Sequence, residues 1–473
     1  MIKRWICLLI LSWAVLPALA QKEELVAALE ERADEYFDVA RQIWEWAEVG
    51  YQENRSSELL MKVLAREGFE LRKGVAGIPT AFVAESGSGT PVIGILAEYD
   101  ALPGLSQAAS PGRMARVEGG AGHACGHHLF GTASVAAAIA VKGWLESTGQ
   151  SGTVRVYGTP AEEGGAGKVY MVREGLFDDT DVVLHWHPSD RTDASPATTL
   201  ANRSAKFRFY GHSTHAAGAP ERGRSALDGV EAMNLMVNML REHVPQETRI
   251  HYVITRGGLA PNVVPDFAEV YYYVRHPSAT MLEEIFPRVI NAAEGAALGT
   301  GTTMDYEIIH GIHAVLPNET LSKVILANLR QLGGIIYTEE EKQFALAVRQ
   351  TLGDVKLPLG SEATVQPFVP RTTKGSTDVG DVSYMVPTAG FYAATWVPGT
   401  AAHSWQAVAA GGMSIGGKGL MLAAKAIALT AIDLAMDPEL LASAREEFER
   451  ARGPDFTYRS LLGNRPPPLD YRK

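Results

Sequence analysis

The chain has 473 residues, a formal net charge of −11, 46% hydrophobic residues and 21% charged residues. This length exceeds that of a typical single hydrophobic core, so we expect two domains in a soluble globular protein. The acidic balance argues against nucleic acid as a partner and against docking on anionic lipid, because both carry negative charge.

The N-terminus has the pattern of a secretory signal. Lys3 and Arg4 form a basic start, residues 5–16 an apolar run, and residues 18–20 a small-residue cleavage site. A membrane anchor or a buried first helix is the alternative, but the run is short for a membrane span. We expect a periplasmic or secreted protein that is not attached to a membrane once residues 1–20 are cleaved. Cys125 would then be its only cysteine, and metal binding would protect that thiol in an oxidising compartment.

Helical and strand patterns alternate along the next part of the chain. Residues 23–70 and 129–145 have helical periodicity. Short apolar runs typical of buried strands lie at 92–97, 154–157 and 182–184. This alternation predicts an α/β fold with a mostly parallel sheet.

Each predicted strand is followed by ionisable side chains. In chain order these are Glu98 and Asp100, Glu162 and Glu163, and His185 and His187. Sites in open α/β sheets form at the carboxyl ends of parallel strands, so we expect these groups to converge.

The sequence rhythm changes near residue 195. Strand-like segments and one long helical segment follow, at 205–210, 225–240, 252–256 and 269–275. They predict an inserted α+β, ferredoxin-like module. We place this module at 196–311 and the main domain, whose strands end on the ionisable groups, at 21–195 and 312–473.

The last part of the chain returns to mixed helix and strand patterns after Asn318. Residues 420–435 form a strongly apolar pattern, which we expect to be the closing helix. The tail after Gly453 contains Pro466-Pro467-Pro468 and is expected to be extended and peripheral.

Three histidines and Cys125 fall within residues 123–128. Cys125 and His127 stand two residues apart, so a thiolate and an imidazole could close on one metal ion. A buried cysteine among capping or core histidines is the alternative, but this density of ligand types favours metal. The chain has no second Cys or His pair at finger-like spacing, which argues against a structural zinc motif.

Glu162 and Glu163 follow a predicted strand and precede two glycines. Adjacent carboxylates are common on protein surfaces, yet this position favours a site. Neighbouring side chains diverge, so one carboxylate could hold metal while the other acts as general base. His187 is the better ligand candidate of its pair because Pro188 stiffens its loop. His403 stands alone and is not a ligand candidate on its own evidence.

Together these motifs resemble the M20 metallopeptidases, in particular the amidohydrolase branch with cysteine and histidine ligands. The resemblance runs in order over nearly the whole mature chain and rests on six segments: AEYDALPG at 97–104, HACGH at 123–127, PAEE at 160–163, WHP at 186–188, GSTDVGDVS at 375–383 and HSWQ at 403–406. It implies a metallopeptidase catalytic domain with an inserted dimerisation lid.

The resemblance also implies roles for individual residues. One or two divalent ions, zinc or manganese, would be held by Cys125, His127, Glu163, His187 and His403. Glu162 would be the general base, and the lid would pair subunits as a homodimer or a heterodimer.

Three lid residues take roles from the resemblance alone. His215 would reach the active site of a neighbouring subunit, for catalysis and substrate binding, while Asn262 and Arg275 would bind a substrate carboxylate. Without the resemblance, His215 would be a solvated loop histidine and Arg275 a charge at a strand edge.

The implied reaction is metal-dependent hydrolysis of an amide bond in an N-acyl or N-aroyl amino acid such as p-aminobenzoyl-glutamate. A dipeptidase or another N-acyl amino acid hydrolase is the alternative within the same class. A catalytically inactive, metal-dependent binding or assembly protein is the alternative from another class, and intact Glu162 argues against it. Glu98-Tyr99-Asp100 stands where many relatives have His-x-Asp, which leaves the roles of Glu98, Asp100 and His185 open.

Overall fold

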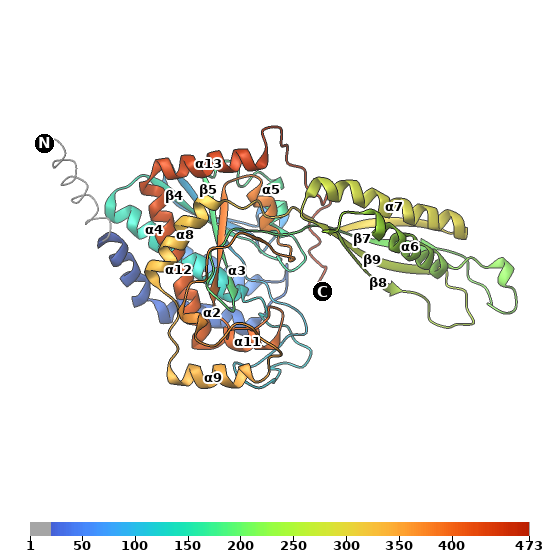
Figure 1. Ribbon diagram of the computed structural model, residues 1–473, viewed down its shortest axis with the longest axis horizontal. Helices are drawn as coiled ribbons and strands as arrows, with labels where there is room; N and C mark the ends of the chain where they lie inside the picture. Colours follow the sequence, from blue (N-terminus) through green and yellow to red (C-terminus); the bar gives the residue numbers. More distant parts are fainter. Residues whose placement is uncertain (1–19, 473) are drawn as a thin grey trace, which may run out of the picture.

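The computed structural model describes residues 20–472, so the basic start and apolar run of the predicted signal lie outside the described residues. Figure 1 shows a large body and a smaller, elongated lid that projects from it. The body is built on a six-stranded sheet and the lid on a four-stranded sheet. Each unit has its own cluster of buried hydrophobic side chains.

The sheet of the body is mixed and mostly parallel. Its strands, in spatial order, are β1 (Glu70–Lys73), β2 (Phe82–Ser88), β4 (Gly152–Gly158), β3 (Val92–Ala97), β5 (Val182–Ser189) and β12 (Thr388–Ala394). The last four run parallel, while β1 and β2 form an antiparallel edge. The predicted strand at 92–97 matches β3, and the other two predicted runs lie inside β4 and β5.

Helices cover this sheet. Residues 20–31 are helical, followed by α2 (Ala33–Trp46), α3 (Asn54–Arg66), α4 (His127–Thr148), α5 (Gly167–Arg173), α8 (Glu319–Leu332), α9 (Glu339–Arg349), α10 (Val379–Ser383), α11 (Trp405–Gly411), α12 (Ser414–Met436) and α13 (Pro438–Arg452). The two longest, α4 and α12, pack against each other. Both are apolar enough to cross a membrane, but their most apolar windows are 83% and 78% buried. Their composition therefore suits the centre of this core.

The lid has the βαββαβ order of a ferredoxin-like unit. It comprises β7 (Ala201–Tyr210), α6 (Ala226–Leu240), β8 (Arg249–Arg256), β9 (Phe267–His276), α7 (Ala279–Thr300) and β10 (Thr303–Ile312). Its antiparallel sheet has the order β10-β7-β9-β8, which leaves β8 at an edge. The predicted fold class is confirmed, although the sequence patterns did not resolve α7 and β10 as separate elements.

The apolar helix predicted at 420–435 is α12, but it does not close the chain. Asp437 accepts hydrogen bonds from the backbone N–H groups of Glu439 and Leu440, and Pro438 occupies the first helical turn. Both features begin a new helix, α13, directly after α12. Only two of its residues are buried, so hydrophobicity did not mark it.

The tail after Gly453 was expected to be peripheral, and this prediction is wrong. Leu461 and Leu462 are buried. Figure 1 shows the tail running down from α13 through the junction between body and lid, where the chain ends. The prolines keep it out of helices and strands, but its backbone and side chains are bound on both sides of the junction.

Candidate active site

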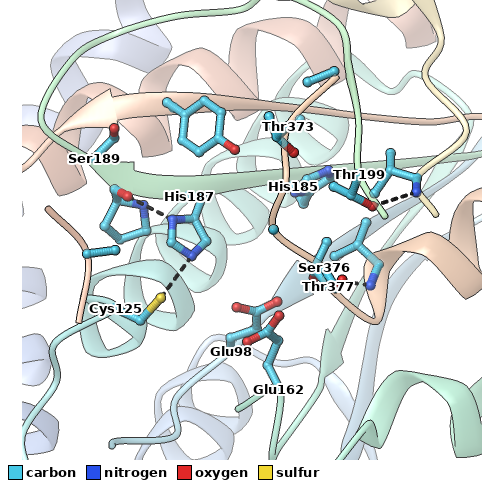
Figure 2. A pocket seen from close by; sticks show the side chains of 18 of the residues that line it. Glu98, Cys125, Glu162, His185, His187, Ser189, Thr199, Thr373, Ser376 and Thr377 are labelled. Carbon is cyan, nitrogen blue, oxygen red and sulfur yellow. Dashed lines mark hydrogen bonds between the residues drawn. The ribbon is translucent and has the colours of Figure 1, made fainter. Parts of the chain in front are cut away.

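A cavity of about 730 Å³ opens at the carboxyl ends of β3, β4 and β5. Five of the six ionisable groups predicted to converge line this cavity, and the two histidines lie within β5 and not after it: Glu98, Glu162, Glu163, His185 and His187. Cys125 and His403 join them, and the lid contributes residues of β7, β9 and β10. Figure 2 shows Glu98 and Glu162 side by side, with Cys125 and His187 to their left.

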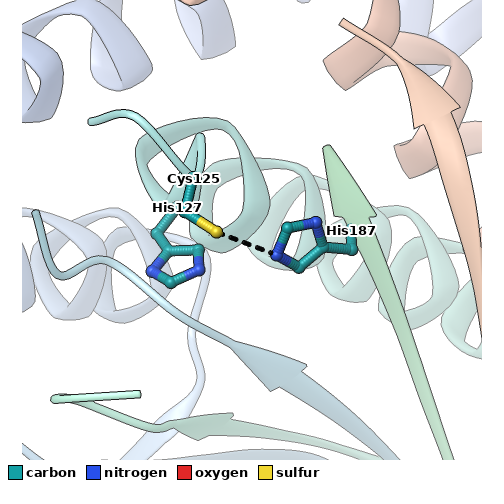
Figure 3. Close-up of side chains that lie close together, drawn as sticks. All are labelled: Cys125, His127 and His187. Atoms are coloured by element: carbon teal, nitrogen blue, oxygen red, sulfur yellow. Dashed lines mark hydrogen bonds between the residues drawn. The ribbon is translucent and has the colours of Figure 1, made fainter. Parts of the chain in front are cut away.

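The first candidate ligand group is Cys125, His127 and His187. Their ligand atoms lie within 4.8 Å of one another, and Cys125 Sγ is 3.3 Å from His187 Nε2 (Figure 3). Gly126, which has a φ of 79°, makes the turn that places Cys125 just before α4. A Cβ at Gly126 would lie 2.6 Å from Pro188 Cβ, so this turn requires glycine both for its conformation and for its packing.

Asp100 holds His127 in a fixed orientation. The Nδ1 atom of His127 is hydrogen-bonded to Asp100 Oδ1 at 2.8 Å, which leaves Nε2 as the ligand atom. The other Asp100 oxygen accepts the backbone N–H of Glu163 at 2.9 Å. Asp100 therefore orients two candidate ligands, His127 and Glu163. Carboxylates commonly hold metal-binding histidines in this way.

The second candidate group is Cys125, Glu163 and His403, again within 4.8 Å. Glu163 Oε1 lies 3.2 Å from His403 Nε2. His403 has a left-handed backbone, with φ of 60°, and its N–H donates to Ala124 O at 2.9 Å, which ties its loop to the Cys125 turn. Cys125 belongs to both groups, so its sulfur could serve as a ligand in either.

The third group, Glu98, His127 and Glu162, also lies within 4.8 Å. Glu98 Oε2 is 3.1 Å from His127 Nε2, yet both atoms are buried without a hydrogen-bond partner among the described residues. Unpartnered buried polar atoms need an explanation, and coordination of a cation would supply one. Across the three groups the donors are a thiol, imidazoles and carboxylates, all of which bind divalent metals, so the residues fit such an ion.

Burial controls the protonation of the cavity wall. Desolvation, together with the charge of His127, lowers the pKa of His187 to about 4, so its imidazole is neutral and able to ligate at neutral pH. Burial and then the neighbouring Glu98 and Glu163 raise the pKa of Glu162. A bound cation would act in the opposite direction on this carboxyl.

Lys168 is part of a buried ion cluster that the sequence did not reveal. Its Nζ lies 2.7 Å from Glu98 Oε1 and 2.7 Å from Asp378 Oδ1. The backbone N–H of Lys168 also donates to Asp378 Oδ2 at 3.0 Å. The three side chains are almost wholly buried. Glu98 is thereby held between Lys168 and His127. Lys168 stands within an apolar stretch of α5 and carried no motif of its own.

His185 is a wall residue of the cavity. It belongs to none of the candidate ligand groups among the described residues. A Cβ at Gly390 would lie 2.2 Å from its Cε1 atom, so the ring packs directly on the backbone of β12.

His215, Asn262 and Arg275, the lid residues that the resemblance singles out, lie in different parts of the lid. His276 at one end of β9 pairs with Ala201, near the body, while Phe267 pairs with Tyr210 at the far end. Arg275 therefore lies beside the body and lines the cavity, and its Nε is buried without a partner among the described residues.

His215 and Asn262 lie in loops beyond the far end of that sheet. Ala216 N donates to Asn262 O at 3.0 Å, and both His215 and Asn262 are exposed. Neither lines the cavity of its own chain. Within one chain, the structure brings Arg275 to the candidate metal site and leaves His215 and Asn262 outside it.

Comparison with known proteins identifies the family. The model of peptidase family M20/M25/M40 matches residues 94–407. The chain is 42% identical to one of the subunits of p-aminobenzoyl-glutamate hydrolase from Escherichia coli K12, over 89% of this chain and 94% of the relative. It is 32% identical to the Xaa-Arg dipeptidase of Mus musculus, over 90% and 92%.

A solved structure shares the fold. The dinuclear metal-binding peptidase of the M20 family from Bacillus subtilis aligns with a TM-score of 0.57 at 18% identity, over 86% of this chain and 99% of that one. Fold, ligand groups and relatives together define a metal-dependent amidohydrolase. The chain belongs to the M20 peptidase family.

Proposed function

We propose that this protein hydrolyses the amide bond of an N-aroyl or N-acyl amino acid, with p-aminobenzoyl-glutamate as the best candidate. The observation that carries the proposal is one cavity lined by Cys125, which belongs to two candidate ligand groups, together with Glu162 and Arg275. The 42% identity to a polypeptide of p-aminobenzoyl-glutamate hydrolase supports this choice of substrate.

The residues divide the chemistry between them. When bound, divalent metal ions supply a more acidic water and a polarised scissile carbonyl. Glu162 takes the proton from the attacking water and returns it to the amide nitrogen as the C–N bond breaks. Arg275 forms charge-assisted hydrogen bonds to a substrate carboxylate and so fixes the scissile bond over Glu162.

Two ions in each protomer would use all five candidate ligands. Cys125, His127 and His187 would hold one ion, and Cys125, Glu163 and His403 the other. The thiolate of Cys125 favours zinc, whereas the carboxylate of Glu163 also suits manganese. Metal analysis of the active protein decides between the two ions.

A second protomer would complete the site through the lid. The edge strand β8 exposes Tyr252, Val253 and Ile254, a surface suited to pairing with another strand. His215 and Asn262, at the far end of the lid, are then available to a partner's cavity. The partner is a second copy or a related chain, since two different subunits of the Escherichia coli p-aminobenzoyl-glutamate hydrolase are relatives of this protein.

Export belongs to the same proposal. The basic start and apolar run of residues 1–20 support a mature chain that begins near Gln21 and works outside the cytoplasm.

A substrate panel tests the proposed activity. We expect metal-loaded protein to release p-aminobenzoate from p-aminobenzoyl-glutamate faster than it cleaves dipeptides with a C-terminal arginine. The dipeptides are included because of the 32% identity to an Xaa-Arg dipeptidase. Cleavage of the arginine dipeptides alone would replace the proposed substrate, and no hydrolysis of any panel member by metal-loaded protein would favour a binding protein.

Removing the metal should abolish hydrolysis. A chelator strips the ions that the Cys125 groups hold, and adding back zinc or manganese should restore the rate. Activity and metal content are measured on the same samples. Hydrolysis that continues at full rate in metal-free protein would contradict the proposed mechanism.

Mixing two inactive variants should restore activity if two copies share their sites. Glu162→Gln has a dead site but an intact His215, while His215→Ala has an intact Glu162. After random exchange of protomers, half of the dimers are mixed and each has one complete site, so the mixture should recover about a quarter of wild-type activity. If the mixture stays inactive although exchange is verified by mass, His215 does not serve a second copy of this chain.

A further inference from the structure

The C-terminal tail is fastened to both units where they meet. On the lid side, Arg465 donates to Ile309 O at 2.9 Å and its guanidinium lies 3.3 Å from Glu307 Oε1 of β10. On the body side, Arg173 donates to Arg465 O at 2.8 Å and Tyr170 Oη to Pro466 O at 3.2 Å, both from α5. The tail therefore follows a defined path towards the cavity.

The end of the tail is fixed just as closely. Gln52 donates to Leu469 O at 2.8 Å, and the ring of Tyr471 packs edge-on against Tyr51 with 5.6 Å between centroids. A Cβ at Gly50 would lie 2.2 Å from Tyr471 Oη, so only glycine leaves room for this ring. These contacts set the position of the next residue, Arg472.

Arg472 reaches the wall of the cavity that holds the candidate metal site. Its Nη2 donates to the backbone carbonyl of Glu163 at 2.7 Å, and Tyr471 Oη contacts the same carbonyl at 3.3 Å. The carbonyl is neutral, so this bond holds the guanidinium without cancelling its charge. A guanidinium has five N–H donors, and this bond uses only Nη2.

The cavity contains two permanent cations among its described lining residues, Arg275 and Arg472. They come from different parts of the chain, β9 of the lid and the tail. Four carboxylates, Glu98, Glu162, Glu163 and Asp190, line the same cavity, and Asp190 is paired with Arg191. A chain with net charge −11 needs cations at the site itself to bind an anionic substrate, and Arg275 and Arg472 are the cations that line this cavity among the described residues.

We propose that Arg472 binds the side-chain carboxylate of an acidic amino acid in the substrate, while Arg275 binds its α-carboxylate. This inference rests on the proposed function and narrows its substrate class to N-aroyl or N-acyl amino acids with two carboxylates. A cationic side chain at the same place would face Arg472 and be repelled.

Two substrates that differ by one charge test this inference. p-Aminobenzoyl-glutamine has nearly the shape of p-aminobenzoyl-glutamate and lacks the side-chain charge. The variant Arg472→Gln should lower kcat/KM for the glutamate substrate on the order of 10- to 100-fold, mainly through KM, because a charge-assisted hydrogen bond is lost. The loss for the glutamine substrate should be smaller by a factor of about ten or more. Arg459→Gln removes an exposed arginine of the same tail and serves as the matched control.

The outcomes separate substrate binding from support of the Glu163 loop. Equal losses on both substrates, or no loss on either, overturn the inference while the proposed hydrolysis stands. Binding of both compounds to Glu162→Gln and to Glu162→Gln/Arg472→Gln is measured by calorimetry, so the test does not depend on turnover. If the wild-type protein hydrolyses neither compound, the proposed function is refuted. If Glu162→Gln, which keeps Arg472, binds both compounds with equal affinity, the role of Arg472 is refuted.

Discussion

Replacing Glu162 with glutamine should lower kcat by about a hundred- to ten-thousand-fold, with the metal content unchanged. Glutamine keeps the shape and polarity of the side chain but cannot accept the proton of the attacking water. Glu162 lies within 4.8 Å of Glu98 and His127 and lines the cavity, beside the ligands and outside both Cys125 groups. Its loss should therefore affect the chemical step more than binding of metal or substrate.

Neighbouring glutamates supply the controls for this variant. Glu163→Gln should lose metal as well as activity, because Glu163 is grouped with Cys125 and His403. Glu174→Gln makes the same exchange at an exposed position after α5 and should change neither. Retention of half the activity in Glu162→Gln would rule out its role as general base, and loss of metal would make it a ligand instead.

The sequence predicted the part of the site that follows from strand direction. The apolar run at 92–97 is β3, and the other runs lie in β4 and β5, all parallel. Parallel strands bring their carboxyl ends to one edge, so Glu98, Glu163 and His187 meet although they are far apart in the chain. Periodicity and direction were enough for this convergence.

Contacts between distant segments could not be predicted in this way. Lys168 and Asp378 are 210 positions apart, and neither belongs to a pattern that indicates the other. Arg472 follows a proline-rich tail that resembles a loose end, and its place depends on partners in the lid, α5 and the Glu163 loop. Such contacts are set by the packing of the two units, which local periodicity does not encode.

Replacing Lys168 with methionine should destabilise the body by about 3–5 kcal/mol, because it leaves Glu98 and Asp378 buried without their common cation. Lys323→Met provides the matched control. Lys323 forms a 2.8 Å ion pair with Glu319, but the side chains are 63% and 48% exposed. Its loss should leave the free energy of unfolding nearly unchanged, because both groups of this pair are exposed to solvent. Chemical unfolding of metal-free protein, followed by tryptophan fluorescence, measures both values.

A triple variant separates lost charge pairing from lost packing. Glu98→Gln, Lys168→Met and Asp378→Asn together remove every charge of the cluster and nearly keep its volume. If the cost of Lys168→Met comes from two unpaired buried carboxylates, the triple variant should be more stable than the single one. A triple variant that is as unstable as Lys168→Met would show instead that the hydrogen bonds of the ammonium group carry the stability. In that case Lys168 would act as a donor that holds Glu98 beside His127, independently of charge compensation.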